Sequence, residues 1–241
     1  MNRTIATAER VLKQLRHDHR TIALLLVVPL FLMTLVSWVF SERVFQSIGL
    51  LMLGIFPFIT MFLVTSIATL RERQTGTLER LLSMPLAKAD FIIGYQLAFA
   101  VVSLVQSVTA VLYAVYLLDL QCAGPLWMVI LVALSVAQLG TALGLAVSAL
   151  AQSEFQAVQF MPAIIIPQFF LCGLFVPREQ LNSALNAVSD VMPLSYAVDV
   201  LARMTVDSTI ASETWQKFGV IWLFVVGSVA VGALTLRRRS A

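Results

Sequence analysis

Six long runs of uncharged, apolar residues constrain the fold of this chain more than any other feature of its sequence. A bilayer core of about 30 Å is crossed by roughly 20 helical residues, so each run is long enough to span a membrane. Only 12% of the 241 residues are charged and 59% are hydrophobic, which does not suit a water-facing surface. We therefore predict an all-α integral membrane protein, with residues 1–241 forming a single transmembrane domain. Its six spans are expected at 21–40, 47–70, 91–118, 126–150, 155–176 and 218–236.

The basic residues predict the orientation of these spans, because Lys and Arg concentrate in cytoplasmic loops. With the N-terminus inside, twelve of the sixteen basic residues are cytoplasmic. Those inside are Arg3, Arg10, Lys13, Arg16, Arg20, Arg71, Arg73, Arg80, Lys88, Arg237, Arg238 and Arg239, and those outside are Arg43, Arg178, Arg203 and Lys217. We expect a multi-pass protein with both termini in the cytoplasm. Because the charges form short patches between apolar runs, they indicate membrane orientation rather than a nucleic-acid partner.

Two segments outside the spans are also expected to be helical. In residues 1–20, Ile5, Ala8, Leu12 and Leu15 share one helical stripe, which predicts an amphipathic helix in the inner membrane interface. This helix is either a basic anchor on anionic lipid or a lever that touches a cytoplasmic partner. Residues 177–217 form the longest polar stretch, and their pattern predicts short helices that dip back toward the membrane outside.

The sequence gives little support for an enzyme. A phosphate-binding P-loop needs a Gly-Lys pair, and the chain contains none. With two cysteines and two histidines, it offers little for a metal site, and we expect neither a metal nor a cofactor. Cys122 and Cys172 are expected to be small apolar residues, although a disulfide between them stays open because both fall near the outer face.

The spans carry no acidic or basic residue, which disfavours an ion-coupled carrier or a proton relay. Their polar residues are uncharged, and glutamines such as Gln96, Gln106 and Gln138 are expected to join helices rather than to bind a ligand.

The most informative polar segment is residues 71–90, RERQTGTLERLLSMPLAKAD. Gly76 should interrupt the helix that leaves the membrane, Thr77 can cap a new helix, and Pro85 ends the pattern. The apolar face of this new helix would consist of Leu78, Leu81 and Leu82. A two-turn amphipathic helix at the membrane surface can fit a groove in a soluble partner. The alternative is a solvated loop between two spans.

This segment resembles a similar run, RE-R-x-x-G-T-L-E-R-L, that joins spans two and three in the membrane subunits of type-2 ATP-binding-cassette exporters. The six-span layout, the amphipathic N-terminal helix and the stretch VMPLSYAVDVLARM at 191–204 are also similar to that family. About six residues separate the first two spans, so the chain looks like the compact drug, lipid or polysaccharide exporters rather than members with a large domain there.

The resemblance implies the permease subunit of a bacterial ATP-driven exporter in the cytoplasmic membrane. Its partners would be a separate cytoplasmic ATPase subunit and a second permease subunit, identical or different, and ATP hydrolysis would occur in the ATPase. The residues implied in coupling to the ATPase are Glu72, Gly76, Thr77, Leu78, Glu79, Arg80 and Leu82. An apolar path for an amphipathic cargo could be lined by Met52, Phe56, Phe58, Phe169 and Phe170. The alternatives are a membrane scaffold or assembly protein without transport and, less favoured, an ion-coupled carrier.

Overall fold

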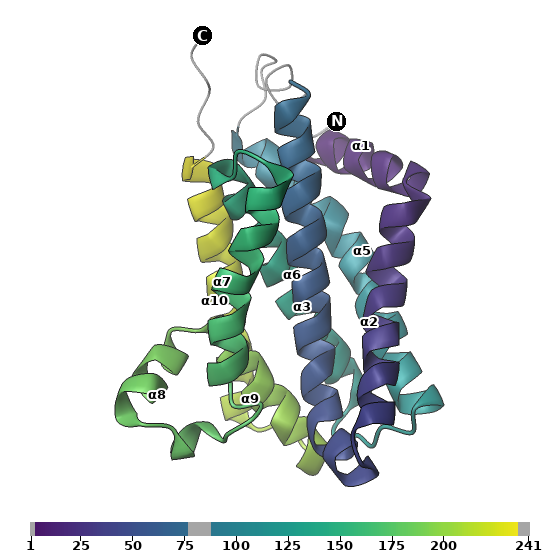
Figure 1. Ribbon diagram of the computed structural model, residues 1–241, viewed down its shortest axis with the longest axis vertical. Helices are drawn as coiled ribbons and strands as arrows, with labels where there is room; N and C mark the ends of the chain where they lie inside the picture. The colour runs from purple at the N-terminus through teal and green to yellow at the C-terminus, as the bar shows by residue number, and fades with distance from the viewer. Residues whose placement is uncertain (1–2, 77–87, 236–241) are drawn as a thin grey trace.

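The computed structural model describes residues 3–76 and 88–235, and their regular structure is entirely helical (Figure 1). Its helices are α1 (Arg3–His17), α2 (His19–Val39), α3 (Glu42–Gln74), α5 (Lys88–Leu117), α6 (Leu126–Leu150), α7 (Glu154–Leu171), the 3-10 turn η1 (Arg178–Gln180), α8 (Ser183–Asp190), α9 (Pro193–Val206) and α10 (Ser212–Thr235). The long helices run side by side, while α1 crosses one end of the bundle and α8 and α9 lie at the other (Figure 1). We call the end that carries α1 the N-terminal end.

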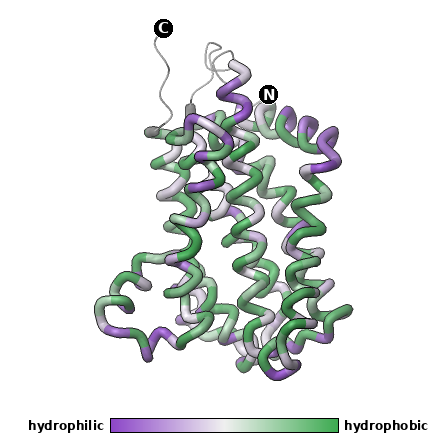
Figure 2. The backbone as a smooth tube through the Cα atoms, in the orientation of Figure 1, coloured by the Kyte–Doolittle hydropathy of each residue, from purple (hydrophilic) through white to green (hydrophobic). Residues whose placement is uncertain are grey.

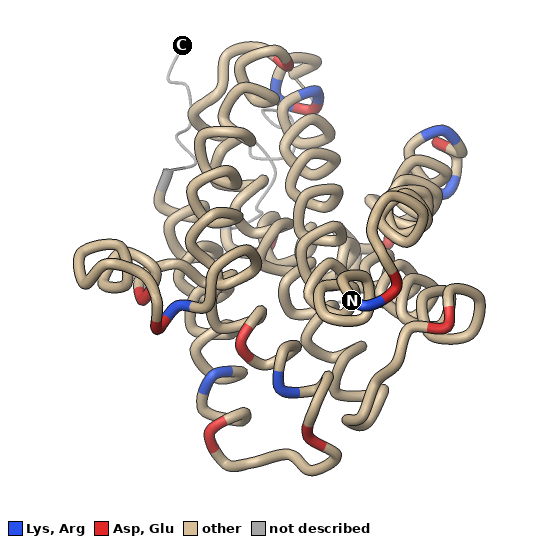
Figure 3. Tube along the Cα trace, turned by 60° about the horizontal axis from the view of Figure 1, so that its bottom comes forward, with Lys and Arg blue, Asp and Glu red and all other residues tan. Residues whose placement is uncertain are grey.

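By length and composition, five of the described helices can cross a membrane, namely α2, α3, α5, α6 and α10. Figure 2 shows their apolar middle sections between polar ends, and Figure 3 shows charged residues gathered toward the ends. These helices make the chain an integral membrane protein.

Helix α7, predicted as the fifth of six spans, is not among these five. It has 18 residues and ends at Leu171 rather than at 176, and it contains Pro162 and Pro167. The helix stops early because Gly173 adopts a φ of +93°, a left-handed conformation that terminates a right-handed helix. Glu154 and three glutamines also lie within its 18 residues. The count of six spans therefore stays a prediction.

Helices α3 and α6 form the centre of the bundle because their backbones are in contact. A Cβ added at Gly140 would lie 2.4 Å from the Phe58 carbonyl oxygen, and one at Gly144 would lie 2.6 Å from that of Phe62. Small residues four positions apart allow such close approach between membrane helices.

Two glutamine side chains join other helices to this centre. Gln106 on α5 donates from Nε2 to the Leu25 carbonyl of α2 at 2.8 Å and to the Thr60 hydroxyl of α3 at 2.7 Å. Gln96 on α5 donates to the Gln138 carbonyl of α6 at 2.8 Å. The prediction that these glutamines link helices is confirmed, as expected where a polar group has no water to bond.

At the end opposite α1, helix α9 closes the bundle and α8 projects from its side (Figure 1). Leu194, Ala197 and Leu201 of α9 are buried. The cysteines at this end are both free, so the alternative of a disulfide is wrong. The Cys122 thiol contacts the Gly124 carbonyl at 3.2 Å, and the buried Cys172 thiol contacts the Phe169 carbonyl at 3.3 Å.

Candidate functional site

The candidate site is the N-terminal end of the bundle, where α1 lies against the first turns of α5. Helix α1 buries Ala8, Val11 and Leu15 in one cluster with apolar residues of α5, whereas Ile5 is 48% exposed. A Cβ at Gly94 of α5 would lie 2.7 Å from the Thr7 Cβ, so the two helices are in tight contact. The apolar stripe expected to face lipid therefore packs mainly against the protein.

An ion pair joins α1 to the end of α3. Arg10 donates from both terminal nitrogens to the Glu72 carboxylate, at 3.0 and 3.3 Å, and also donates to the Tyr95 hydroxyl of α5 at 3.1 Å. The side chains of Arg10 and Glu72 are only 27% and 14% exposed. Burial disfavours the charge of Arg10, but the hydrogen bonds to Glu72 and Tyr95 outweigh it, and the pKa of this guanidinium is raised. Three helices thus meet at one half-buried ion pair.

The start of α5 is tied to α1 as well. The Thr4 hydroxyl donates to the Asp90 carboxylate at 2.8 Å. Glu72 and Asp90 stand on either side of residues 77–87 in the sequence, so both flanks of that segment contact the same helix.

The opposite side of the α3 terminus is attached to the connection between α6 and α7. Arg71 donates twice to the Glu154 carboxylate, at 2.7 and 3.2 Å, and Arg73 donates to the Ser148 carbonyl of α6. Gln74 donates to the Gln152 carbonyl at 3.2 Å. The hydrogen bond from Arg71 lowers the pKa of the exposed Glu154 carboxyl. The end of α3 is therefore held by α1 on one side and by α6 and α7 on the other.

Gly76 ends α3 as predicted. Its φ is +71°, and its N–H bonds the Arg73 carbonyl at 3.3 Å. A side chain at this position would meet no atom within 4 Å, so the backbone conformation rather than space requires glycine. Of the other coupling residues, Thr77, Leu78, Glu79, Arg80 and Leu82 lie outside the described residues. Glu72 is described, and it faces Arg10 within the chain.

The five residues predicted to line a cargo path differ in their burial. Met52 and Phe58 are buried in the core, and Phe56 packs against that core from the edge. Phe169 and Phe170, at the end of α7, form an aromatic cluster with Phe175, with ring centroids 5.1 to 6.3 Å apart. Phe170 is 58% exposed.

These sequence and structural features agree with a comparison against protein families. The profile described as ABC-2 type transporter matches residues 3–204, which is most of the chain. The chain belongs to the ABC-2 type transporter family. The match extends from α1 into α9 and includes the attachments that Arg10, Arg71, Glu72, Asp90 and Glu154 make at the N-terminal end of the bundle.

Similar curated proteins carry related names. ABC transporter G family member 20 of Dictyostelium discoideum is 26% identical over 71% of this chain and 24% of that protein. Nodulation protein J of Rhizobium leguminosarum bv. viciae is 29% identical over 47% of this chain and 45% of that protein. The probable multidrug ABC transporter permease YbhR of Escherichia coli K12 is 23% identical over 73% of this chain and 47% of that protein. The matches thus span about a quarter to a half of these relatives.

This ABC-2 transporter chain has a second charged cluster, at the end opposite α1, that the sequence did not predict. Asp199 of α9 accepts from Arg178 at 2.9 Å and from Lys217 of α10 at 3.0 Å. Arg203 bonds Glu213 at 2.6 Å, and Arg178 also pairs with Asp190. The sequence signal for this cluster was the presence of charged residues at 178, 199 and 217 within the longest polar stretch of the chain. Among the described residues, no group of three His, Cys, Asp or Glu could hold a metal ion.

Proposed function

We propose that this chain is the permease subunit of an ATP-driven exporter in a bacterial cytoplasmic membrane, with both termini in the cytoplasm. A separate ATP-binding-cassette subunit would dock at the N-terminal end of the bundle, against residues 77–87. The family membership supports this proposal, as does a relative named as a multidrug ABC transporter permease. The excess of basic residues at this end supports the orientation.

The observation that carries the proposal is the set of attachments around residues 77–87. Glu72 and Asp90 bind Arg10 and Thr4 of α1, while Arg71, Arg73 and Gln74 bind the connection between α6 and α7. Any force that an ATPase applies to this segment reaches α1, α3, α5 and α7 through direct contacts. Such contacts allow a rigid-body change between two states when the partner binds the two states differently.

The cargo path would form against a second permease subunit. Helices α3 and α7 pack together and carry all five predicted path residues. On α7, the exposed residues Ile166 and Phe170 are one turn apart on the same face, which leaves an apolar surface for a partner or a cargo. In this proposal Phe56, Phe169 and Phe170 contact an amphipathic cargo, and the buried Met52 and Phe58 support them.

The experiment is reconstitution with and without the cognate ATPase. The purified chain alone should hydrolyse no ATP above background, and the complex should export cargo with ATP hydrolysis. Leu78→Ala should weaken ATPase docking by about tenfold or more, because a leucine buried at an interface contributes about 1.5 to 3 kcal/mol. Glu79→Ala should have a smaller effect if its contact is solvated. Leu223→Ala is the control, since Leu223 is 70% exposed on α10.

In both coupling variants, the membrane level of the chain should stay normal while export and ATPase stimulation fall together. If the Leu78→Ala, Glu79→Ala and double variants docked the ATPase and exported cargo at wild-type levels, the proposed coupling role of Leu78 and Glu79 would be wrong. ATP hydrolysis by the isolated chain would end the permease-subunit proposal.

A further inference from the structure

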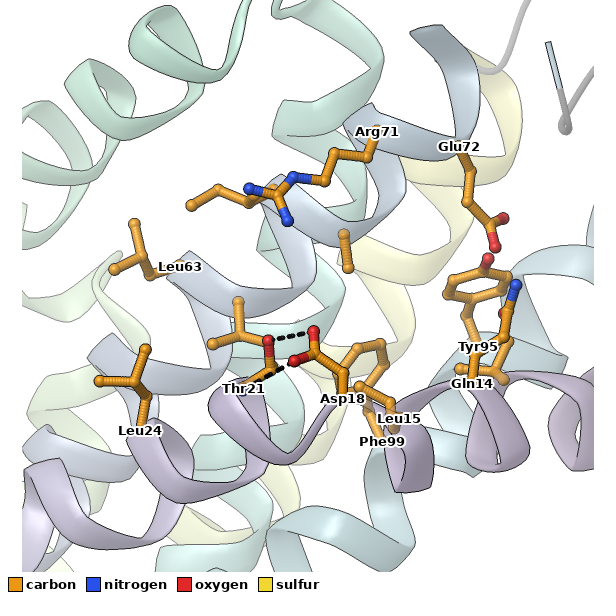
Figure 4. Close-up of a pocket in the computed structure, with 14 residues that line it drawn as sticks. Gln14, Leu15, Asp18, Thr21, Leu24, Leu63, Arg71, Glu72, Tyr95 and Phe99 are labelled. Atoms are coloured by element: carbon orange, nitrogen blue, oxygen red, sulfur yellow. Dashed lines mark hydrogen bonds between the residues drawn. The ribbon is translucent and has the colours of Figure 1, made fainter. Parts of the chain in front are cut away.

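A groove with a volume of about 360 Å³ lies between the turn that joins α1 to α2 and the adjacent half of α3 (Figure 4). Volumes of this size hold drug-sized molecules. The groove is mostly apolar, and its apolar lining includes Leu15, Leu24, Leu63, Val64, Ile67 and Ala68. Its polar residues include Asp18 and Thr21 at the α1–α2 turn and Arg71 at the α3 terminus. The groove is therefore amphipathic, with its charges toward the N-terminal end of the bundle.

The three charged residues that line the groove differ in how they are neutralised. Glu72 is paired with Arg10, and Arg71 binds Glu154 through two hydrogen bonds. Asp18, in contrast, forms no ion pair with any residue in 3–76 or 88–235 and accepts hydrogen bonds from the N–H and the hydroxyl of Thr21, at 3.1 and 2.6 Å. Arg71 attracts this carboxylate electrostatically without an ion-pair contact, and its hydrogen bonds go to Glu154. Asp18 is thus the one charged residue of the groove that has no ion-pair partner among the described residues.

The position of this carboxylate is fixed by local structure. Asp18 caps α2, and Figure 4 shows its carboxylate bonded to Thr21, which also lines the groove. The hydrogen bonds from Thr21 lower the pKa of Asp18, so the group is ionised at neutral pH. It is solvent-exposed, and a positively charged group can therefore reach it without displacing protein atoms.

We propose that this groove binds an amphipathic cation taken from the inner leaflet, with its apolar body along α3 and its cationic head at Asp18. The proposal rests on the exporter function, because it names the cargo class and the place where the cargo first binds. The complementarity has two parts. The apolar walls match a hydrophobic chain or ring system, and the unpaired carboxylate matches an ammonium at the depth of the headgroups.

The test is equilibrium binding to the purified chain in phosphatidylcholine nanodiscs, without ATPase. The probe is 1,12-diaminododecane dansylated at one end, which carries a single ammonium on an apolar chain, and its N-acetylated form is the neutral analogue. Empty nanodiscs correct for partitioning into lipid. The wild-type chain should bind the cationic probe about fivefold or more tightly than the neutral one, allowing for solvent screening of an exposed carboxylate.

The key variant is Asp18→Asn, because asparagine caps a helix as well as aspartate does and changes only the charge. We expect it to remove the preference for the cation while affinity for the neutral analogue is unchanged. Glu9→Gln is the matched control, since it removes one exposed negative charge from α1 outside the groove. It should leave the preference intact.

A second pair of variants tests the groove itself. Ala68→Phe should fill the groove and weaken the binding of both probes. Ala230→Phe, at an exposed alanine of α10, should leave the binding of both probes unchanged. Equal binding of the two probes to the wild type, or equal losses in Asp18→Asn and Glu9→Gln, would overturn the proposal. So would loss of probe binding in phosphatidylethanolamine nanodiscs, because the groove would then belong to a lipid headgroup. If reconstituted export persisted alongside such results, only the groove proposal would be wrong, and the exporter function would still be supported.

Discussion

The pair formed by Arg10 and Glu72 should contribute measurable coupling between α1 and α3. We propose a double-mutant cycle with Arg10→Gln, Glu72→Gln and the combined variant. Each single variant leaves one member of a bidentate pair without its partner, at side chains that are 27% and 14% exposed. The double variant removes both charges, so its loss in free energy of unfolding should be smaller than the sum of the losses in the two single variants.

The magnitude follows from the burial of the pair. Breaking a fully buried ion pair costs about 3 to 5 kcal/mol, and exposed pairs contribute about 0 to 1 kcal/mol. The burial of this pair lies between the two cases. Each single variant should therefore lower the free energy of unfolding by about 1 to 3 kcal/mol, and the coupling energy should be about 1 to 2 kcal/mol. Arg10 keeps its bond to the Tyr95 hydroxyl, which limits the loss in Glu72→Gln.

The assay is reversible unfolding in mixed micelles, followed by the fluorescence of the native tryptophans. The control cycle uses Arg71 and Glu154, which are 60% and 42% exposed and should couple by less than about 0.5 kcal/mol. If the Arg10–Glu72 cycle gave no more coupling than this control, the reasoning from burial would be wrong. If the exporter function holds, the Glu72→Gln subunit should also show reduced stimulation of its ATPase at normal membrane levels.

Three further outcomes are expected. Gly140→Ala should destabilise the chain by about 1 to 3 kcal/mol, as overpacking does, because its Cβ would lie 2.4 Å from a backbone oxygen. Gly227→Ala on α10, with nothing within 4 Å, should shift the same unfolding curve by less than about 1 kcal/mol. In intact cells, with the native cysteines replaced, an impermeant thiol reagent should label Ser208→Cys and not Ser83→Cys; the reverse would refute the orientation. The lowered pKa of Glu154 means that its pair with Arg71 stabilises the fold above the ordinary carboxyl pKa and is lost as pH falls through the lowered one. Glu154→Gln should flatten the acid limb of a stability–pH curve.

Much of the membrane architecture could be predicted because apolar run length and glycine chemistry are local properties. Helix α6 has the predicted bounds of 126–150, and α3 ends two residues before Gly76, the residue that was expected to interrupt it. The early end of α7 was missed because Gly173 sits inside an apolar run, and composition does not report a left-handed residue.

The candidate site was less predictable because its contacts join residues far apart in the sequence. Arg10 and Glu72 are separated by 62 positions, and Arg10 looked like one more basic residue of an amphipathic helix. The stripe on α1 was read correctly as apolar, but periodicity alone does not say whether lipid or α5 covers it. The same limit applies to Met52 and Phe58, which are apolar residues of a buried face.

The contact of α6 glycines with α3 carbonyls restricts which parts of this chain can slide. Gly140 and Gly144 are one turn apart, about 6 Å along the helix axis. A smaller shear would move both glycines away from the Phe58 and Phe62 carbonyls, and the α3 backbone has no room for a Cβ in their place. Helices α3 and α6 should therefore move together as one rigid body. Rearrangement is then confined to surfaces where side chains meet, such as those of α2 and α7, whose rotamers can change without a backbone collision.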